Sequence, residues 1–245
     1  MRIPRIFTAQ TLTGGATLVL EPGPSQHLAR ALRMGPGDAL CLFDGSGVDF
    51  PATIVSADKR AVTVALEQGQ PGLVESPLRI HLGIGVSRGE RMDWVVQKAT
   101  ELGVAEITPL YTERTEVRLR GEREARKLQH WQQVAISACE QSGRSCLPQV
   151  HAPGTVPGWT SDCEDAQRLV LHHRAAPLPA TASSPTSLSL LVGPEGGLSE
   201  AEIATAMAAG FLPLALGPRV LRTETAPLAA LAILQAHWGD MCLPR

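Results

Sequence analysis

Two short glycine-bearing segments have the clearest chemical potential in this sequence. The first reads GPEGG at residues 193–197, and the second reads LGPRVLRTET at residues 216–225. Their glycines leave backbone N–H and C=O groups open to a ligand, and such groups can bind the edge of an adenine and a ribose. Neither segment is a GxGxxG or GxxxxGK[ST] phosphate loop. We therefore expect a ligand of nucleoside size without a phosphate chain.

Each segment follows an apolar run that we interpret as a buried strand. Apart from Ser189, residues 188–192 and 211–216 are apolar runs rather than alternating ones, which indicates strands covered on both faces, as in the parallel sheet of an α/β protein. Ligands of such sheets bind just beyond the carboxyl ends of the strands. Between the runs, residues 199–210 predict a helix, because Ser199 and Glu202 can form a capping box.

Together the two segments closely resemble those of the RsmE family of ribosomal-RNA uridine N3-methyltransferases, in the SPOUT superfamily. The stretches QKATELG at residues 97–103 and EQSGR at residues 140–144 are also similar to that family. The resemblance implies an α/β domain with a SPOUT-type parallel sheet, whose S-adenosylmethionine site is a C-terminal deep trefoil knot. It also implies a preceding small PUA-like β-barrel that binds RNA, and a homodimer formed through the knotted domains.

The rest of the chain divides near residue 72. Residues 1–72 carry five short β-type runs separated by turn signals, with a short helix at residues 25–32, which is typical of a small barrel. Glycines and prolines make residues 68–77 the best linker candidate. Beyond them strands and helices alternate, which indicates an α/β domain at residues 73–245. Within that domain we expect residues 153–165 to form a loop.

Composition limits the remaining possibilities. No apolar run approaches the roughly 20 residues that cross a bilayer, and the N-terminus lacks the apolar core of a signal peptide, so we expect no membrane and a cytoplasmic location. The five cysteines show no metal spacing, and we expect no metal. Because the net charge is −2, RNA binding must depend on a local basic patch.

The resemblance implies which residues bind the cofactor S-adenosyl-L-methionine. Backbone groups near the strand ends would hold its adenosine part, and Gly197 and Thr225 would shape the pocket. The complete expected set is Leu171, His172, Val192, Gly193, Pro194, Glu195, Gly197, Leu216, Gly217, Leu221, Arg222 and Thr225.

The implied reaction methylates N3 of a uridine in 16S rRNA, and that nitrogen is a poor nucleophile until its proton leaves. Catalysis needs a base, or a cation that stabilises the resulting anion. The candidate cations are Arg222, Arg114 and Arg144. The candidate proton acceptors are Glu195, Glu224 and Glu140, and the sequence does not choose among them. For RNA contact we expect Arg5, Arg33, Lys98, Arg114 and Arg144.

Three alternatives stay open. The first is another SPOUT methyltransferase, acting on transfer RNA or a ribose hydroxyl; the RTET run at residues 222–225 argues against it, because it resembles the uridine N3 family. The second is a non-catalytic, RNA-binding ribosome assembly factor, against which the intact glycine segments argue. The third, an unrelated nucleotide-binding enzyme, is disfavoured by the missing phosphate loop. The expected partner is 16S rRNA, free or in the assembled small subunit.

Overall fold

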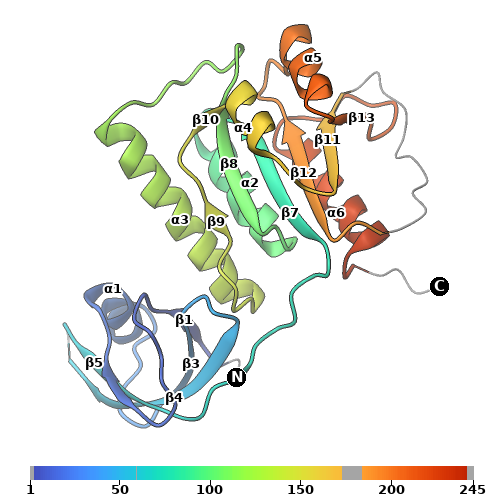
Figure 1. Cartoon of the computed structure of the whole chain (residues 1–245). Coiled ribbons are helices and arrows are strands. Elements are labelled where there is room, and N and C mark those ends of the chain that lie inside the picture. Colours follow the sequence, from blue (N-terminus) through green and yellow to red (C-terminus); the bar gives the residue numbers. More distant parts are fainter. Residues whose placement is uncertain (1–2, 59, 173–183, 242–245) are drawn as a thin grey trace. The chain divides into compact units, whose positions relative to one another are not determined.

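The computed structural model describes residues 3–58, 60–172 and 184–241 of the 245-residue chain (Figure 1). The chain forms two compact units. The first consists of residues 1–75 and 136–147, and the second of residues 76–135 and 148–245. The first unit therefore takes a short stretch from the middle of the sequence in addition to the N-terminal part.

The first unit is built on a six-stranded, mostly antiparallel sheet. The strand order is β1 (Arg5–Phe7), β3 (Ala39–Phe43), β4 (Val48–Ala57), β5 (Val62–Leu66) and β2 (Thr17–Val19), with β6 (Gln70–Pro71) paired to β4. Strand β1 runs parallel to β3. Helix α1 (Pro22–Gln26) continues into a π-helical turn, His27–Ala31. The five strands and the short helix that the sequence predicted here are confirmed.

The core of the first unit is a cluster of aliphatic side chains contributed by the strands and by Leu28 of the π-helical turn. Its fully buried members include Leu40, Leu42, Val62 and Val64. Helix α3 (Glu122–Ser142) belongs to this unit from residue 136 onward. The residues after the helix are tied into the unit by bridges between Cys146 and the turn at residues 45–46.

The second unit contains a seven-stranded sheet in which the described strand pairs are all parallel. The order is β10 (Gly154–Thr155), β8 (Glu106–Tyr111), β7 (Arg79–Gly85), β12 (Ser187–Val192), β11 (Gln167–Leu171) and β13 (Leu212–Leu214), with β9 (Gln149–Val150) paired to β8. The prediction of an α/β domain with a parallel sheet is confirmed.

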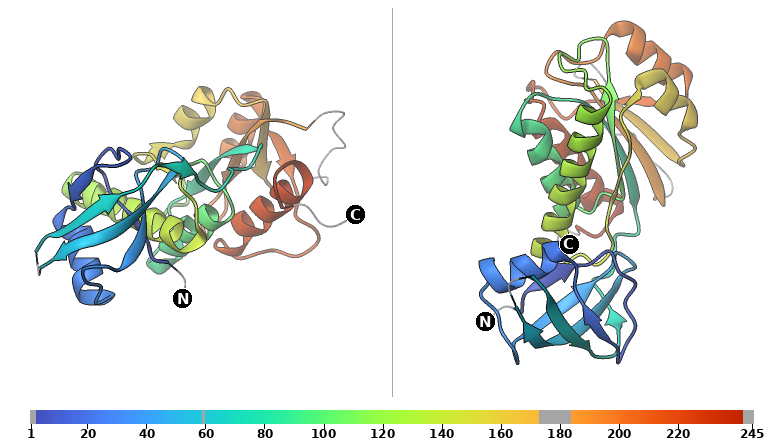
Figure 2. Two further views of the ribbon diagram at one scale, coloured as in Figure 1. Left: turned by 90° about the horizontal axis from the view of Figure 1, so that it is seen from below. Right: turned by 90° about the vertical axis from the view of Figure 1, so that its left-hand side faces the viewer.

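Helices cover both faces of this sheet (Figure 2). Helix α2 (Glu90–Glu101), the first part of α3 and helix α6 (Thr225–Trp238) pack on one face, together with Leu190 of β12. Helices α4 (Val156–Asp162) and α5 (Glu200–Ala208) pack on the other, together with Leu191. Successive residues of β12 thus enter opposite cores. This strand is covered on both faces, as its largely apolar run predicted.

Two expectations about the second unit are wrong. Strand β13 is not covered on both faces, because it forms an edge of the sheet and its Leu212 is 47% exposed. Pro213, which has no N–H to donate, suits an edge strand. Residues 153–165 are not a loop but contain β10 and α4. The helix begins there because the Thr155 side chain accepts a hydrogen bond from the Gly158 N–H, with Pro157 in the first turn.

The last helix, α6, is apolar around most of its surface and buries one side in the core. Leu231 is fully buried, and so is Gln235, whose amide donates to the carbonyl of Leu102 at the end of α2 and accepts from the Ser76 hydroxyl. On the other side Ile233 is 43% exposed. Within the described residues, no helix combines the length and the apolar character that crossing a membrane requires.

Candidate functional site

A pocket of about 430 Å³ opens in the second unit, where β11, β12 and β13 end. Both glycine-bearing segments line it, the first with residues 193–197 and the second with residues 216–217, 219–221 and 223. Pockets of about 300–1,000 Å³ suit small-molecule ligands, and the carboxyl ends of parallel strands are where such ligands bind. The volume therefore suits a ligand of nucleoside size.

The predicted cofactor residues gather at this pocket. Two of the set, Arg222 and Thr225, do not line it: they are exposed, and their neighbours Thr223 and Ala226 line it instead. The members that line the pocket are Leu171, His172, Val192, Gly193, Pro194, Glu195, Gly197, Leu216, Gly217 and Leu221.

Sequence reasoning missed several other residues of the lining. Arg219 stands in the second glycine-bearing segment, so its residue type and position could have suggested that it lines the pocket. Leu214 of β13 and Ile203 of α5 also line the pocket. These two carry no distinguishing signal, because an aliphatic residue on a strand or helix is usually part of a core.

The first glycine segment is a tight turn that favours glycine at positions 193 and 197 for different reasons. The Gly197 N–H donates to the Pro194 carbonyl at 2.8 Å, and Gly197 has φ +68°, a left-handed conformation that favours glycine. At Gly193 an added Cβ would stand 2.7 Å from the backbone nitrogen of Leu198. Glycine is therefore favoured at both positions, by close packing at 193 and by backbone conformation at 197, and the backbone of the turn stays open to the pocket.

The loop after β8 holds this turn and the start of α5. Arg114 donates from Nη1 to the carbonyl of Gly196 at 2.8 Å. The backbone N–H of Glu113 donates to Glu202 at 2.9 Å. Glu202 also forms the capping box with Ser199, so that prediction is confirmed. The first glycine segment is thus tied to the β8 side of the sheet through main-chain and side-chain bonds.

Glu195, at the centre of the turn, is held by hydrogen bonds. It accepts from the Arg88 backbone N–H at 3.1 Å and pairs with the Arg91 guanidinium at 2.9 Å. Partial burial alone would raise its pKa, but hydrogen bonds from its own backbone N–H, from Arg88 and from Arg91 lower the pKa overall. A carboxyl group whose pKa is lowered is a weak proton acceptor.

Arg222 and Glu224 lie near the end of the second glycine segment, just before α6. The Arg222 carbonyl accepts from the N–H groups of Thr225 and Ala226, each at 2.9 Å, and so forms the first turn of the helix. The side chain of Arg222 is exposed. Glu224 Oε2 lies 4.0 Å from Nε of Arg91. The carboxylates of both segments therefore approach the same guanidinium.

Glu140 and Arg144, two further candidates for catalysis, lie in the first unit and do not line the pocket. Arg144 is 5% exposed and pairs with Glu75 at 2.6 Å. Glu140 accepts a hydrogen bond from the Phe7 N–H at 3.0 Å, and burial raises its pKa. Both side chains have structural partners within their own unit.

The remaining residues expected to contact RNA differ in exposure. Arg5 is mostly buried and pairs with Asp49 at 2.6 Å. Arg33 is exposed and has φ +54°, a left-handed conformation that is uncommon for a residue with a side chain. Lys98, on α2 of the second unit, pairs with Glu101 at 2.8 Å. Of the three, Arg33 is the side chain most open to an incoming phosphate.

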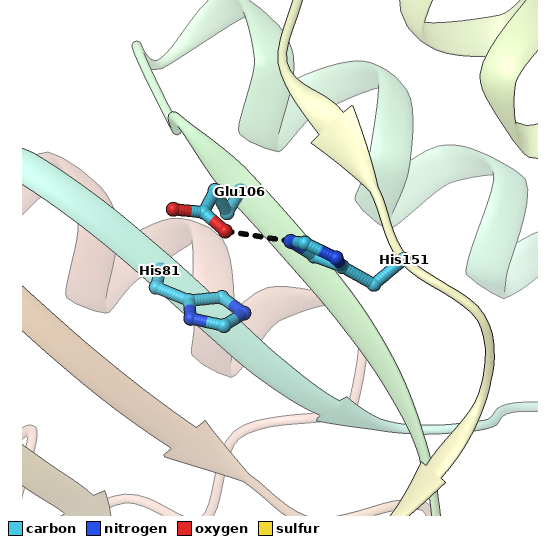
Figure 3. A group of neighbouring side chains, drawn as sticks. All are labelled: His81, Glu106 and His151. Atoms are coloured by element: carbon cyan, nitrogen blue, oxygen red, sulfur yellow. Dashed lines mark hydrogen bonds and ion pairs between the residues drawn. The ribbon is translucent and has the colours of Figure 1, made fainter. Parts of the chain in front are cut away.

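A second group of polar side chains lies at the amino ends of β7 and β8, opposite the pocket. His81, Glu106 and His151 point toward one another, with potential ligand atoms within 4.8 Å of each other (Figure 3). His151 Nε2 lies 2.6 Å from Glu106, and the Trp159 indole N–H donates to His81 Nε2 at 3.1 Å. Glu106 and His151 are thus bonded to each other, whereas His81 has its own partners, Trp159 and Thr108. The sequence did not reveal this group, because its members are far apart along the chain, in β7, in β8 and just after β9.

Comparison with known proteins identifies two matching regions. A family model described as an RNA methyltransferase domain matches residues 74–235, and one described as an RNA methyltransferase PUA domain matches residues 25–67. The ribosomal RNA small subunit methyltransferase E of Buchnera aphidicola subsp. Schizaphis graminum is 33% identical over 242 residues, covering 98% of both chains. The Bacillus subtilis protein of the same name is 29% identical, covering 93% of both.

Solved structures show the same similarity in three dimensions. A ribosomal RNA small subunit methyltransferase E from Neisseria gonorrhoeae, bound to S-adenosyl methionine, has a TM-score of 0.90 at 37% identity, covering 98% of this chain and 99% of that one. A Legionella pneumophila protein solved with the cofactor SAM has a TM-score of 0.94 at 41% identity, covering 98% and 100%. The resemblance seen in the two glycine segments is confirmed, and the chain belongs to the ribosomal RNA small subunit methyltransferase E family.

Proposed function

We propose that this protein transfers a methyl group from S-adenosylmethionine to N3 of a uridine in the 16S rRNA of the small ribosomal subunit. The observation that carries the proposal is the pocket at the carboxyl ends of β11 and β12, lined by both glycine segments, in a chain of the methyltransferase E family. Relatives of known structure bind S-adenosylmethionine, which supports the same cofactor here.

The residues of the pocket fit a sulfonium nucleoside. Aliphatic residues such as Leu171, Val192 and Leu216 line it, and the glycine turn leaves its backbone uncovered for an adenine edge and a ribose. The bound cofactor would supply a methyl group that is already activated. The protein's own contribution is therefore positioning and the handling of charge.

Deprotonation of uracil N3 leaves an anion that a nearby guanidinium would stabilise. Arg222 is our first candidate, because its side chain is exposed at the end of the second segment. Arg219, which lines the pocket, is another. Among the carboxylates of the two segments we favour Glu224 as proton acceptor. The other carboxylate, Glu195, is less suited, because its hydrogen bonds lower the pKa of Glu195.

The family also supports finer proposals. The C-terminal part of the second unit would form a deep trefoil knot, residues 1–72 an RNA-binding PUA-like barrel and residues 73–245 the methyltransferase domain. Two copies would pair through the knotted domains and act in the cytoplasm without a metal. Val220, 84% exposed, and Ile233, 43% exposed, support pairing, because covering apolar side chains is favourable.

Mapping modified uridines tests the substrate. In cells lacking this gene, mass spectrometry of 16S rRNA should show the loss of an N3-methyluridine, and a plasmid copy should restore it. N3 is hidden in a Watson–Crick pair, so the target uridine must be unpaired or flipped out. If every N3-methyluridine survives, the uridine assignment is wrong. If calorimetry detects no saturable binding of S-adenosylmethionine, a non-catalytic assembly factor becomes the better proposal.

A further inference from the structure

Arg91, in the first turn of α2, lies between the two glycine segments. Its Nη1 donates to Glu195 Oε1 at 2.9 Å, and its Nε lies 4.0 Å from Glu224 Oε2. Glu195 belongs to the first segment and Glu224 to the second. One guanidinium from a third element of the unit therefore approaches a carboxylate on each of the two segments that line the pocket.

The connection from β7 to α2 also packs closely on the first segment. It leads directly into the first turn of α2, where Arg91 stands. The backbone N–H of Arg88 donates to the same oxygen of Glu195 that Arg91 contacts. At Gly85, the last residue of β7, an added Cβ would stand 2.5 Å from the ring of Pro194. Packing and hydrogen bonds thus fix the first segment against this connection. Arg91, which follows the connection, is therefore held in a position from which its guanidinium approaches Glu224.

We propose that Arg91 is a positioning residue that sets the separation of the two glycine segments and so the shape of the cofactor pocket. The inference rests on the proposed function, because it assigns Arg91 to the pocket of that reaction. The planar guanidinium suits the role, since its N–H groups point in several fixed directions, whereas a lysine ammonium is a compact point charge. Arg91 also offsets the repulsion between two carboxylates that approach one site.

The side chains involved are partly exposed, 46% for Arg91, 36% for Glu195 and 25% for Glu224, and this sets the scale of the expected effects. Loss of an exposed ion pair changes an equilibrium constant by about fivefold at most. Misplacing reacting groups by about 1 Å can lower a rate by about 100-fold. A positioning residue should therefore affect the rate more than the affinity.

The test measures S-adenosylmethionine affinity by calorimetry and methyl transfer to 16S rRNA for the full-length protein and its variants. Arg91→Ala should raise the cofactor Kd by about fivefold. It should lower kcat at saturating cofactor further, by about 10- to 100-fold. Arg91→Lys keeps the positive charge but lacks the planar guanidinium. Its Kd and kcat should fall between those of the wild type and of Arg91→Ala.

A double-mutant cycle on the cofactor Kd tests whether Arg91 acts through Glu224. If it does, Glu224→Gln should change Kd less in the Arg91→Ala background than in the wild type. Arg126→Ala is the matched control, because Arg126 pairs with Glu122 at 2.8 Å on the exposed face of α3, and it should leave both Kd and kcat unchanged. Should Arg91→Ala not fold, Arg91→Lys and Glu224→Gln carry the test.

Three results would overturn the inference. The first is wild-type Kd and kcat in Arg91→Ala. The second is full activity in Arg91→Lys, because a single charge would then suffice. The third is strict additivity of Arg91→Ala and Glu224→Gln. Failure of the proposed function looks different, since the wild-type protein would itself neither bind S-adenosylmethionine nor methylate RNA, and the inference would then fail with it.

Discussion

The guanidinium of Arg114 donates to the carbonyl oxygen of Gly196 at 2.8 Å, so the loop after β8 holds the turn of the first glycine segment. The two residues are also in close packing, because a Cβ on Gly196 would stand 3.0 Å from Cβ of Arg114. Arginine has five N–H donors, and this bond uses one of them. Arg114 can therefore shape the pocket and still offer donors to RNA.

Arg114→Ala should weaken S-adenosylmethionine binding by about two- to tenfold, the range expected for one hydrogen bond. The physical reason is that the Gly196 carbonyl, and with it the turn, loses its partner. Calorimetric titration of the cofactor without RNA measures this effect separately from any RNA contact. Arg118→Ala, an exposed arginine of the same loop, is the control and should bind normally. Unchanged affinity in Arg114→Ala would leave Arg114 with a role in RNA contact alone.

Gly193→Ala should both destabilise the protein and weaken cofactor binding. The new Cβ would meet the backbone of Leu198 at 2.7 Å and of Gly197 at 2.8 Å, so the turn must shift. Overpacking of this kind destabilises a protein by about 1–3 kcal/mol, which chemical denaturation measures. Gly23→Ala is the control, because nothing lies within 4 Å of the added atom. Normal cofactor affinity in Gly193→Ala would show that this turn is not part of the cofactor site.

Local signals predicted the framework of the pocket. The largely apolar run of β12 identified a strand buried on both faces, and the residue types at Ser199 and Glu202 identified a capping box. Both features depend on residues within a few positions of each other. The same kind of signal misled for β13, where an apolar run lies at the edge of the sheet and leaves Leu212 exposed.

Pairings between distant residues could not be predicted from the sequence. Arg144 meets Glu75, and Glu140 meets the backbone of Phe7, although each pair is far apart along the chain. Tertiary contacts decide whether an arginine is buried in an ion pair or stays exposed. Such contacts have no local signature in the sequence. This is why the candidate cations Arg144 and Arg222 looked alike in the sequence and differ in exposure in the structure.

Arg222→Ala should strongly slow methyl transfer while leaving the fold intact. The Arg222 side chain is exposed and its helix-forming contacts come from its carbonyl, so the free energy of unfolding should change by no more than about 0.5 kcal/mol. Removal of a cation that stabilises a developing anion lowers a rate by about 100- to 1,000-fold. Single-turnover methylation of 16S rRNA with saturating cofactor measures this. Turnover close to that of the wild type would remove Arg222 from the mechanism.

The network at the amino ends of β7 and β8 should make stability depend on pH. Burial lowers the pKa of His81, and the charge of His151 lowers it further, although Glu106 opposes both effects. The Trp159 N–H donates to Nε2 of His81, a bond that requires this nitrogen to be unprotonated. The pKa of Glu106 is also lowered, since the bond with His151 and the nearby positive charges outweigh its partial burial.

The unfolding free energy should therefore fall as the pH drops below about 6.5, the ordinary histidine pKa, because the unfolded chain then takes up a proton that folded His81 resists. Glu106 adds to the loss at lower pH, as the pH approaches its lowered pKa in the folded state. Urea denaturation between pH 5 and 8 measures the slope, and His81→Gln should reduce it. Thr108→Val removes a hydroxyl 2.7 Å from His81 Nε2 but no titrating group, so it should shift stability and keep the slope. An undiminished slope in His81→Gln would assign the acid sensitivity to other groups.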